Sequence, residues 1–169
     1  MRNKKKDHGF TLIELLVVIA IIGVISNVLI VALGRARTKA RRSRALADLR
    51  ELYNSIELLK TDTGLHPGAI ALEPWLEDQE IDLEDCSAGL MCTDGSFPNW
   101  QGPYMNKVPL DPWGRSYRFD PDYYCRDYVY GCESLPDNTV ERAILSFGPE
   151  RVDEQDYEGS DNLVLLLNP

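Results

Sequence analysis

The feature that most constrains this chain is a long apolar run near its N-terminus. The 19 residues from Leu15 to Leu33 carry no charge, and only Ser26 and Asn27 among them are polar. At about 1.5 Å per residue, a helix of this length spans roughly 28 Å, close to the thickness of the hydrocarbon layer of a membrane. No signal-peptide cleavage site of the small-residue type follows the run. The sequence therefore predicts a membrane-spanning helix that stays joined to the rest of the chain.

The helical pattern continues beyond the apolar run. No proline interrupts residues 10–66, and Thr61 to Gly64 followed by His66-Pro67 forms a stop signal. Between residues 36 and 59, apolar residues recur at helical spacing on one face: Leu46, Leu49, Leu52, Tyr53, Ile56 and Leu59. The sequence predicts one helix over residues 10–63, on the order of 80 Å long. Its second half is expected to pack against a globular head.

One carboxylate, Glu14, stands at the edge of the apolar run, after a basic leader at residues 1–9. A charged side chain at a bilayer centre costs ~2.5–3.5 kcal/mol on insertion scales, so Glu14 is expected to have a partner. The residues around it read Gly9-Phe10-Thr11-Leu12-Ile13-Glu14. This segment resembles the type IV pilin superfamily, which includes pilins and the pseudopilins of type II secretion systems.

The resemblance implies how Glu14 is neutralised. A prepilin peptidase would cleave between Gly9 and Phe10, and the new amino group of Phe10 would be methylated. Glu14 would then pair with the Phe10 amine of a neighbouring subunit, since cleavage creates a positive charge that can neutralise a carboxylate in a dry helix bundle. The leader would lie on the cytoplasmic side. Val31 departs from the family pattern, because a proline is common at this position.

Charge is strongly divided along the chain. Six cations lie just after the apolar run, whereas residues 45–169 carry a net charge of −17. This basic band consists of Arg35, Arg37, Lys39, Arg41, Arg42 and Arg44. It fits anionic lipid headgroups, or acidic patches of neighbouring subunits in a filament. Two features argue against nucleic acid as a partner: the exposed head is acidic, and a filament core would bury the band.

The head, residues 64–169, is long enough for one modest core. Its strand candidates are short apolar runs at residues 117–119, 128–130, 143–145 and 163–167. Packed against the second half of the helix, they predict an α+β fold with a small antiparallel sheet. Residues 73–85 are acidic and predict a solvated loop or a short helix.

A second motif lies in the head. Gly102-Pro103-Tyr104 is followed by Asp111-Pro112-Trp113-Gly114 and then Tyr117. The segment is similar to one in the major pseudopilin of type II secretion systems. Its residue types predict a rigid turn that leads into a strand, with Trp113 and Tyr117 capping the core. A carbohydrate-binding aromatic pair is the functional alternative.

Four cysteines form two close pairs, and neither pair has the spacing of a zinc ribbon. An even number in an exported head favours disulfides. The simplest connectivity joins Cys86 to Cys92 and Cys125 to Cys132. Free thiols and a metal site built from all four cysteines are the alternatives.

The C-terminal segment is rich in carboxylates and turn residues. Calcium prefers six to eight oxygen ligands on a flexible loop. The segment resembles the C-terminal calcium loop of the major pseudopilin, and the resemblance implies Glu150, Asp153, Ser160 and Asp161 as Ca²⁺ ligands. Glu150 departs from the family pattern, which has aspartate there. A solvated acidic loop is the alternative.

No catalytic constellation is present in the sequence: His8 lies in the leader, and His66 stands alone before a proline. The main hypothesis is therefore not an enzyme but a filament subunit resembling the major pseudopilin. A surface type IV pilin for adhesion, motility or DNA uptake is the second hypothesis, and a membrane-anchored secreted hydrolase is the third.

The resemblance also implies partners and a location. The expected partners are further copies of this chain, prepilin peptidase, the inner-membrane assembly platform and other minor pseudopilins or pilins. Before assembly, the subunit would cross the inner membrane once with its head outside the cytoplasm. It would then join a periplasmic or extracellular filament.

Overall fold

The computed structural model describes residues 12–70, 80–125, 132, 135–136, 139–149 and 162–167. Its first element is the helix α1, Leu12–Thr63, which has 52 residues. The helical backbone continues without a break through Asn27, Val31 and Gly34. Val31 stands where the type IV pilin superfamily commonly has a proline, and the helix is unbroken there. The long helix that the sequence predicts is therefore confirmed. The chain divides into two compact units, residues 1–40 and 41–169.

The first unit contains the N-terminal part of α1. Its large apolar side chains are exposed, from Val18 at 44% to Leu12 at 80%. Within the described part of the chain, no helix combines the length and the apolar character that crossing a membrane demands.

In the second unit, α1 supplies one wall of the core. Ala45, Leu49, Leu52, Ile56 and Leu59 are fully buried, and their spacing of three or four residues places them on one face. The helix ends where Gly64, at φ +74°, donates its backbone N–H to the Lys60 carbonyl at 2.8 Å. Glycine adopts this left-handed conformation without a steric penalty, which explains the stop.

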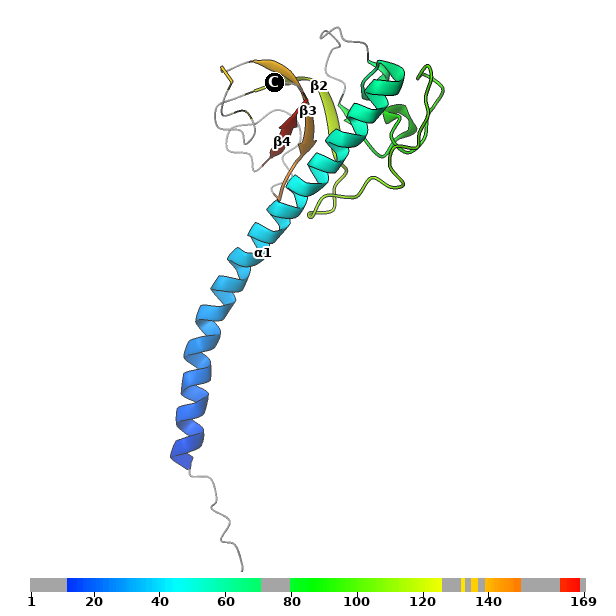
Figure 1. Ribbon diagram of the computed structural model, residues 1–169. Coiled ribbons are helices and arrows are strands. Elements are labelled where there is room, and N and C mark those ends of the chain that lie inside the picture. The colour runs from blue at the N-terminus through cyan, green and yellow to red at the C-terminus, as the bar shows by residue number, and fades with distance from the viewer. Residues whose placement is uncertain are drawn as a thin grey trace, which may run out of the picture. The chain divides into compact units, whose positions relative to one another are not determined.

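The sheet has four antiparallel strands in the order β1-β2-β3-β4. These are β1 (Ile81–Asp82), β2 (Arg118–Tyr124), β3 (Val140–Ser146) and β4 (Leu163–Leu166). Two 3-10 helices, η1 (Pro67–Ala69) and η2 (Cys86–Ala88), lie in the connections. Figure 1 shows β2, β3 and β4 beside the second half of α1. The register between β2 and β3 shifts between Asp120 and Tyr123.

The sheet contributes to a separate cluster on each of its faces. Phe119, Ile144 and Leu163 join the buried face of α1 in the main core. Ala143, Leu145 and Val164 belong to a second cluster, which also contains Tyr123 and the cysteines 125 and 132. Successive residues of a strand point to opposite faces, so β3 is buried on both sides. The predicted α+β class is confirmed.

Three of the predicted strands correspond to β2, β3 and β4, and the prediction at residues 128–130 lies outside the described residues. The loop or helix predicted for residues 73–85 is wrong at Ile81–Asp82, which form β1. Ile81 pairs with Phe119 of β2, and Leu83 is fully buried. Strand pairing and burial of Leu83 therefore determine the structure of residues 81–83, although the segment is acidic.

Candidate functional site

The N-terminal site is described only in part. Glu14 lies in the first turn of α1, where a carboxylate interacts favourably with the helix dipole. Gly9 and Phe10, the predicted processing residues, lie outside the described residues. Cleavage, methylation and the pairing of Phe10 with Glu14 stay predictions.

The Asp111-Pro112-Trp113-Gly114 segment forms a tight turn around the side chain of Asp111. Its Oδ1 accepts hydrogen bonds from the backbone N–H groups of Trp113 at 3.0 Å and Arg115 at 2.9 Å. The Asp111 N–H donates to the Arg115 carbonyl at 2.8 Å, and Gly114 has φ +87°. The carboxylate thus satisfies donors that the turn would otherwise leave unpaired, as this residue type does in turns.

The second carboxylate oxygen of Asp111 joins this turn to the sheet. The hydroxyl of Ser146, at the end of β3, donates to Asp111 Oδ2 at 2.8 Å, and both residues are buried. The Gly148 N–H donates to the same hydroxyl at 3.4 Å. The turn is therefore tied to the point where β3 leads into the acidic C-terminal segment.

Beside this turn lies a pocket of about 160 Å³, lined by Asp82, Arg115, Ser116, Arg118 and Phe147. The guanidinium carbons of Arg115 and Arg118 lie 5.7 and 5.3 Å from the centre of the Phe147 ring, within cation–π range. Arg118 Nη1 also contacts Glu80 at 2.6 Å. The lining holds one carboxylate and two guanidinium groups, and the Ser116 hydroxyl in it donates to Glu84 Oε2 at 3.0 Å.

Two tyrosines connect the head to α1. The Tyr117 hydroxyl donates to Asp48 Oδ2 at 3.0 Å, and the Tyr104 hydroxyl donates to Asp62 Oδ2 at 3.0 Å. Tyr117 is fully buried, as expected for a core residue, and burial next to Asp48 raises the pKa of its hydroxyl. Trp113 is partly buried against the same core, which agrees with the predicted capping role.

The Gly102-Pro103-Tyr104 segment is built around close packing. The Gly102-Pro103 peptide bond is cis. A Cβ atom at position 102 would come within 2.5 Å of the Trp100 ring, so only glycine fits there without displacement. The Trp100 and Tyr104 rings pack edge to face with centroids 6.0 Å apart. This arrangement positions the Tyr104 hydroxyl toward α1 and gives the motif a structural role.

Both predicted disulfides are present. Cys86 is bonded to Cys92, and Cys125 is bonded to Cys132, with Cα–Cα distances of 4.7 and 5.5 Å. No free cysteine remains. The second bond lies within the second cluster, where both cysteines are fully buried.

The residues predicted to bind calcium, Glu150, Asp153, Ser160 and Asp161, all lie outside the described residues. In the part that is described, no group of three or more His, Cys, Asp or Glu side chains could hold a metal ion.

Two buried titratable groups lie near the sheet. The ring of His66 stacks on Phe119 with centroids 5.9 Å apart, and burial, with Arg142 and Lys60 nearby, lowers its pKa from 6.5 to about 4. Burial also raises the pKa of the Asp120 carboxyl from 3.8 to about 7. Burial therefore shifts both groups toward their neutral forms.

Sequence reasoning missed the partners of these motifs. Ser146 and Asp48 gave no motif signal of their own, although a serine that ends an apolar strand candidate is a polar group that needs a partner. The buried state of His66 was also missed. Its position between a helix stop and a proline was the only available signal.

Comparison with known families places these features in context. A family model described as "Type II secretion system (T2SS), protein G" matches residues 32–123, and one described as "Prokaryotic N-terminal methylation motif" matches residues 4–26. The first match includes the second half of α1, the Gly-Pro-Tyr motif and the Asp111 turn.

Curated relatives agree with this assignment. The type II secretion system core protein G of Escherichia coli K12 is 33% identical over 118 residues, which cover 69% of this chain and 74% of the relative. The protein of the same name from Vibrio cholerae is 28% identical over 123 residues, covering 70% and 74%. That of Dickeya chrysanthemi is 27% identical over 143 residues, covering 79% and 83%. No solved structure gives a significant match. Since the family match spans more than half of the 169 residues, the chain belongs to the type II secretion system protein G family.

Proposed function

We propose that this protein is the major pseudopilin of a type II secretion system, a structural subunit that polymerises into a helical pseudopilus and drives protein export. The match to the protein G family over residues 32–123 carries the proposal. It also favours a secretion filament over a surface pilin and gives the protein a structural role rather than an enzymatic one.

The methylation motif at residues 4–26 supports processing and inner-membrane anchoring through the N-terminal helix. In this proposal, prepilin peptidase removes residues 1–9 and the amine of Phe10 is methylated. The head lies outside the cytoplasm, and the exposed apolar side chains of α1 pass from lipid into the filament core. Copies of this chain, the assembly platform and minor pseudopilins are the proposed partners.

The test measures the mass of the mature protein and the export of secreted proteins. The mass of the mature protein from host membranes should correspond to a chain that begins at Phe10 with one added methyl group. Deletion of its gene should stop the export of secreted proteins, and the wild-type gene should restore it. An uncleaved chain, or unchanged export after deletion, would contradict the proposal.

We also propose that the acidic C-terminal segment binds Ca²⁺ through Glu150, Asp153, Ser160 and Asp161. The carboxylates in the sequence support this site, because calcium prefers carboxylate and carbonyl oxygens. Calcium that binds the folded state must raise the melting temperature. We expect this rise for the wild type and not for Asp161→Ala, and an equal melting temperature of the wild type with calcium and with chelator would refute the site.

A further inference from the structure

The basic band of α1 is the largest charged feature that the proposed function leaves unused. Its six cations are exposed and lie within one helix. No Asp or Glu occurs in the sequence between Glu14 and Asp48. Arg44 contacts Asp48 at 3.7 Å but remains 64% exposed, so this ion pair leaves the guanidinium accessible.

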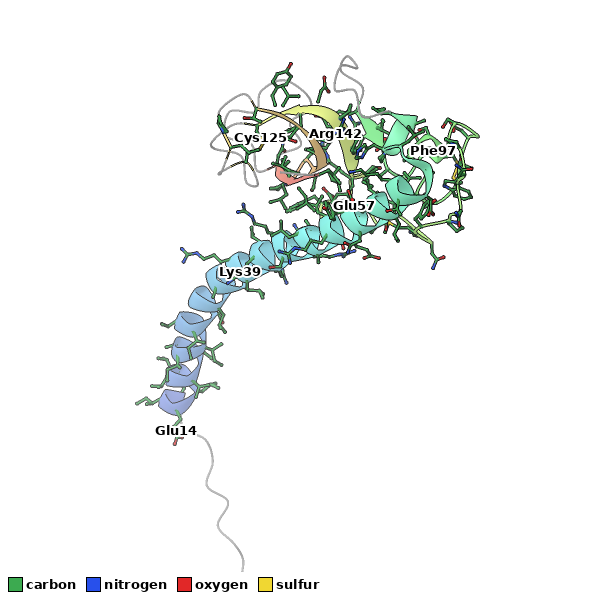
Figure 2. The ribbon with its side chains drawn as sticks, turned by 45° about the horizontal axis from the view of Figure 1, so that its top comes forward. Glu14, Lys39, Glu57, Phe97, Cys125 and Arg142 are labelled. Carbon is green, nitrogen blue, oxygen red and sulfur yellow. A yellow bond between two sulfur atoms is a disulfide. The ribbon has the colours of Figure 1, made fainter. Side chains whose placement is uncertain are left out.

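The band forms two stripes along the helix. Arg35, Lys39 and Arg42 follow one another at spacings of four and three residues, and Arg37, Arg41 and Arg44 do the same. Residues with these spacings share a helix face, whereas residues two positions apart are rotated by roughly 200°. The stripes therefore lie on different sides of α1. In Figure 2, side chains with nitrogen at their ends project from α1 on both sides near Lys39.

We propose that this band binds the phosphate groups of anionic phospholipids around the helix. Along α1 it directly follows the exposed apolar run that ends at Leu33. Cations attract anionic headgroups by charge wherever a membrane leaflet contains anionic lipid, and a bilayer surrounds a helix on every side. The inference rests on the proposed membrane-anchored state.

Charge explains why the subunit needs such a band. Residues 45–169 carry a net charge of −17, which an anionic surface repels. The cations offset this repulsion where the helix meets the headgroups. The acidic head of a second copy is the competing partner, and the lipid measurement below separates the two.

The experiment measures lipid retention by the full chain. Native mass spectrometry would count the lipids that remain bound after transfer from neutral detergent micelles containing phosphatidylglycerol or phosphatidylcholine. One variant replaces Arg35, Lys39 and Arg42 by glutamine, and a second replaces Arg37, Arg41 and Arg44. The control replaces Arg50 and Lys107, two exposed cations outside the band.

The wild type should retain phosphatidylglycerol in preference to phosphatidylcholine. Each stripe variant should lower this preference at least ~10-fold, because each cation near a lipid surface contributes roughly fivefold to binding. The control should match the wild type. Equal retention of both lipids, or a loss confined to one stripe, would overturn the proposal. Chemical cross-linking between copies is measured for the same variants. If the stripe variants retained lipid as the wild type does but cross-linked less, the band would contact a second copy instead of lipid.

A separate measurement keeps the two proposals distinguishable. Flotation of the wild type with phosphatidylcholine vesicles tests the apolar anchor without anionic lipid. Failure to float would contradict the proposed anchoring. Flotation combined with equal retention of both lipids would contradict only the role of the band.

Discussion

The hydrogen bonds of Asp111 should account for a large part of the stability of the head. Asp111→Ala removes the acceptor for the N–H groups of Trp113 and Arg115 and for the hydroxyl of Ser146. A hydrogen bond to a charged group contributes ~1.5–3 kcal/mol, and a buried donor without a partner adds a desolvation penalty. Water can reach the two half-buried backbone donors in the variant, so we expect a total loss of about 3–5 kcal/mol in the free energy of unfolding.

Ser146→Ala removes one of the three hydrogen bonds of Asp111 and also the long one, 3.4 Å, that the Gly148 N–H donates to the Ser146 hydroxyl. Asp111 keeps both backbone donors, so the expected loss is about 1.5–2 kcal/mol. The double variant should be at most ~0.5 kcal/mol less stable than Asp111→Ala, because the two side chains share one interaction. Asp94→Ala is the matched control. Asp94 also accepts a backbone N–H, from Ser96 at 3.0 Å, but it lies in an exposed loop and its replacement should leave stability unchanged.

The assay is urea unfolding of the full chain in neutral detergent micelles, followed by tryptophan fluorescence. Trp113, one of the three tryptophans of the chain, lies within the turn itself, so part of the emission comes from this region. A loss below ~1 kcal/mol for Asp111→Ala would refute the reasoning, because it would mean that the buried carboxylate contributes no more than a surface residue. Fully additive losses in the double variant would also refute it.

Further predictions concern the other buried groups of the head. The neutral form of His66 is favoured in the folded state, so its contribution is complete above its unfolded pKa of 6.5 and is lost as the pH falls toward about 4. Urea unfolding should show a loss of ~1 kcal/mol between about pH 7.5 and pH 5.5 that is absent in His66→Leu. The effect of Asp120 on stability has the opposite pH dependence. Its pKa rises to about 7 in the folded state, so ionisation of Asp120 opposes folding as the pH rises. Asp120→Asn should therefore raise the melting temperature above pH 7 but not at pH 4, and a gain at both pH values would contradict the assignment. Replacing Cys125 and Cys132 by alanine should lower stability by about 2.5 kcal/mol from loop entropy alone, and the same loss in a reduced wild type would check the value.

The sequence predicted those parts of the fold that depend on local pattern. The buried face from Ala45 to Leu59 follows from helical spacing, and the stop at Gly64 follows from the conformational freedom of glycine. β3 and β4 were visible as apolar runs, whereas only the start of β2, at Arg118 and Phe119, lay in a predicted strand. β1 was not visible, because two residues between acidic neighbours carry no periodic signal, and only pairing with Phe119 makes them a strand.

In the candidate site, too, the sequence predicted the residues that follow a local pattern but not their distant partners. The residues of the Asp111 turn were identifiable because turn chemistry requires particular residue types at adjacent positions. Their partners were not, because Ser146 and Asp48 lie 35 and 69 residues away from the side chains that they bind. Contacts over such separations arise only when the chain is folded. The disulfides were predictable because each one joins cysteines that are close in sequence.

Filament assembly by a Glu14→Ala variant is the decisive test of how the subunits join. In the proposed filament, Glu14 pairs with the methylated amine of Phe10 in a neighbouring subunit. The variant should therefore be cleaved after Gly9 and remain in the membrane, but electron microscopy should show few or no filaments and export should fall. Normal filaments of the cleaved variant would contradict the pairing and with it the proposed assembly mechanism.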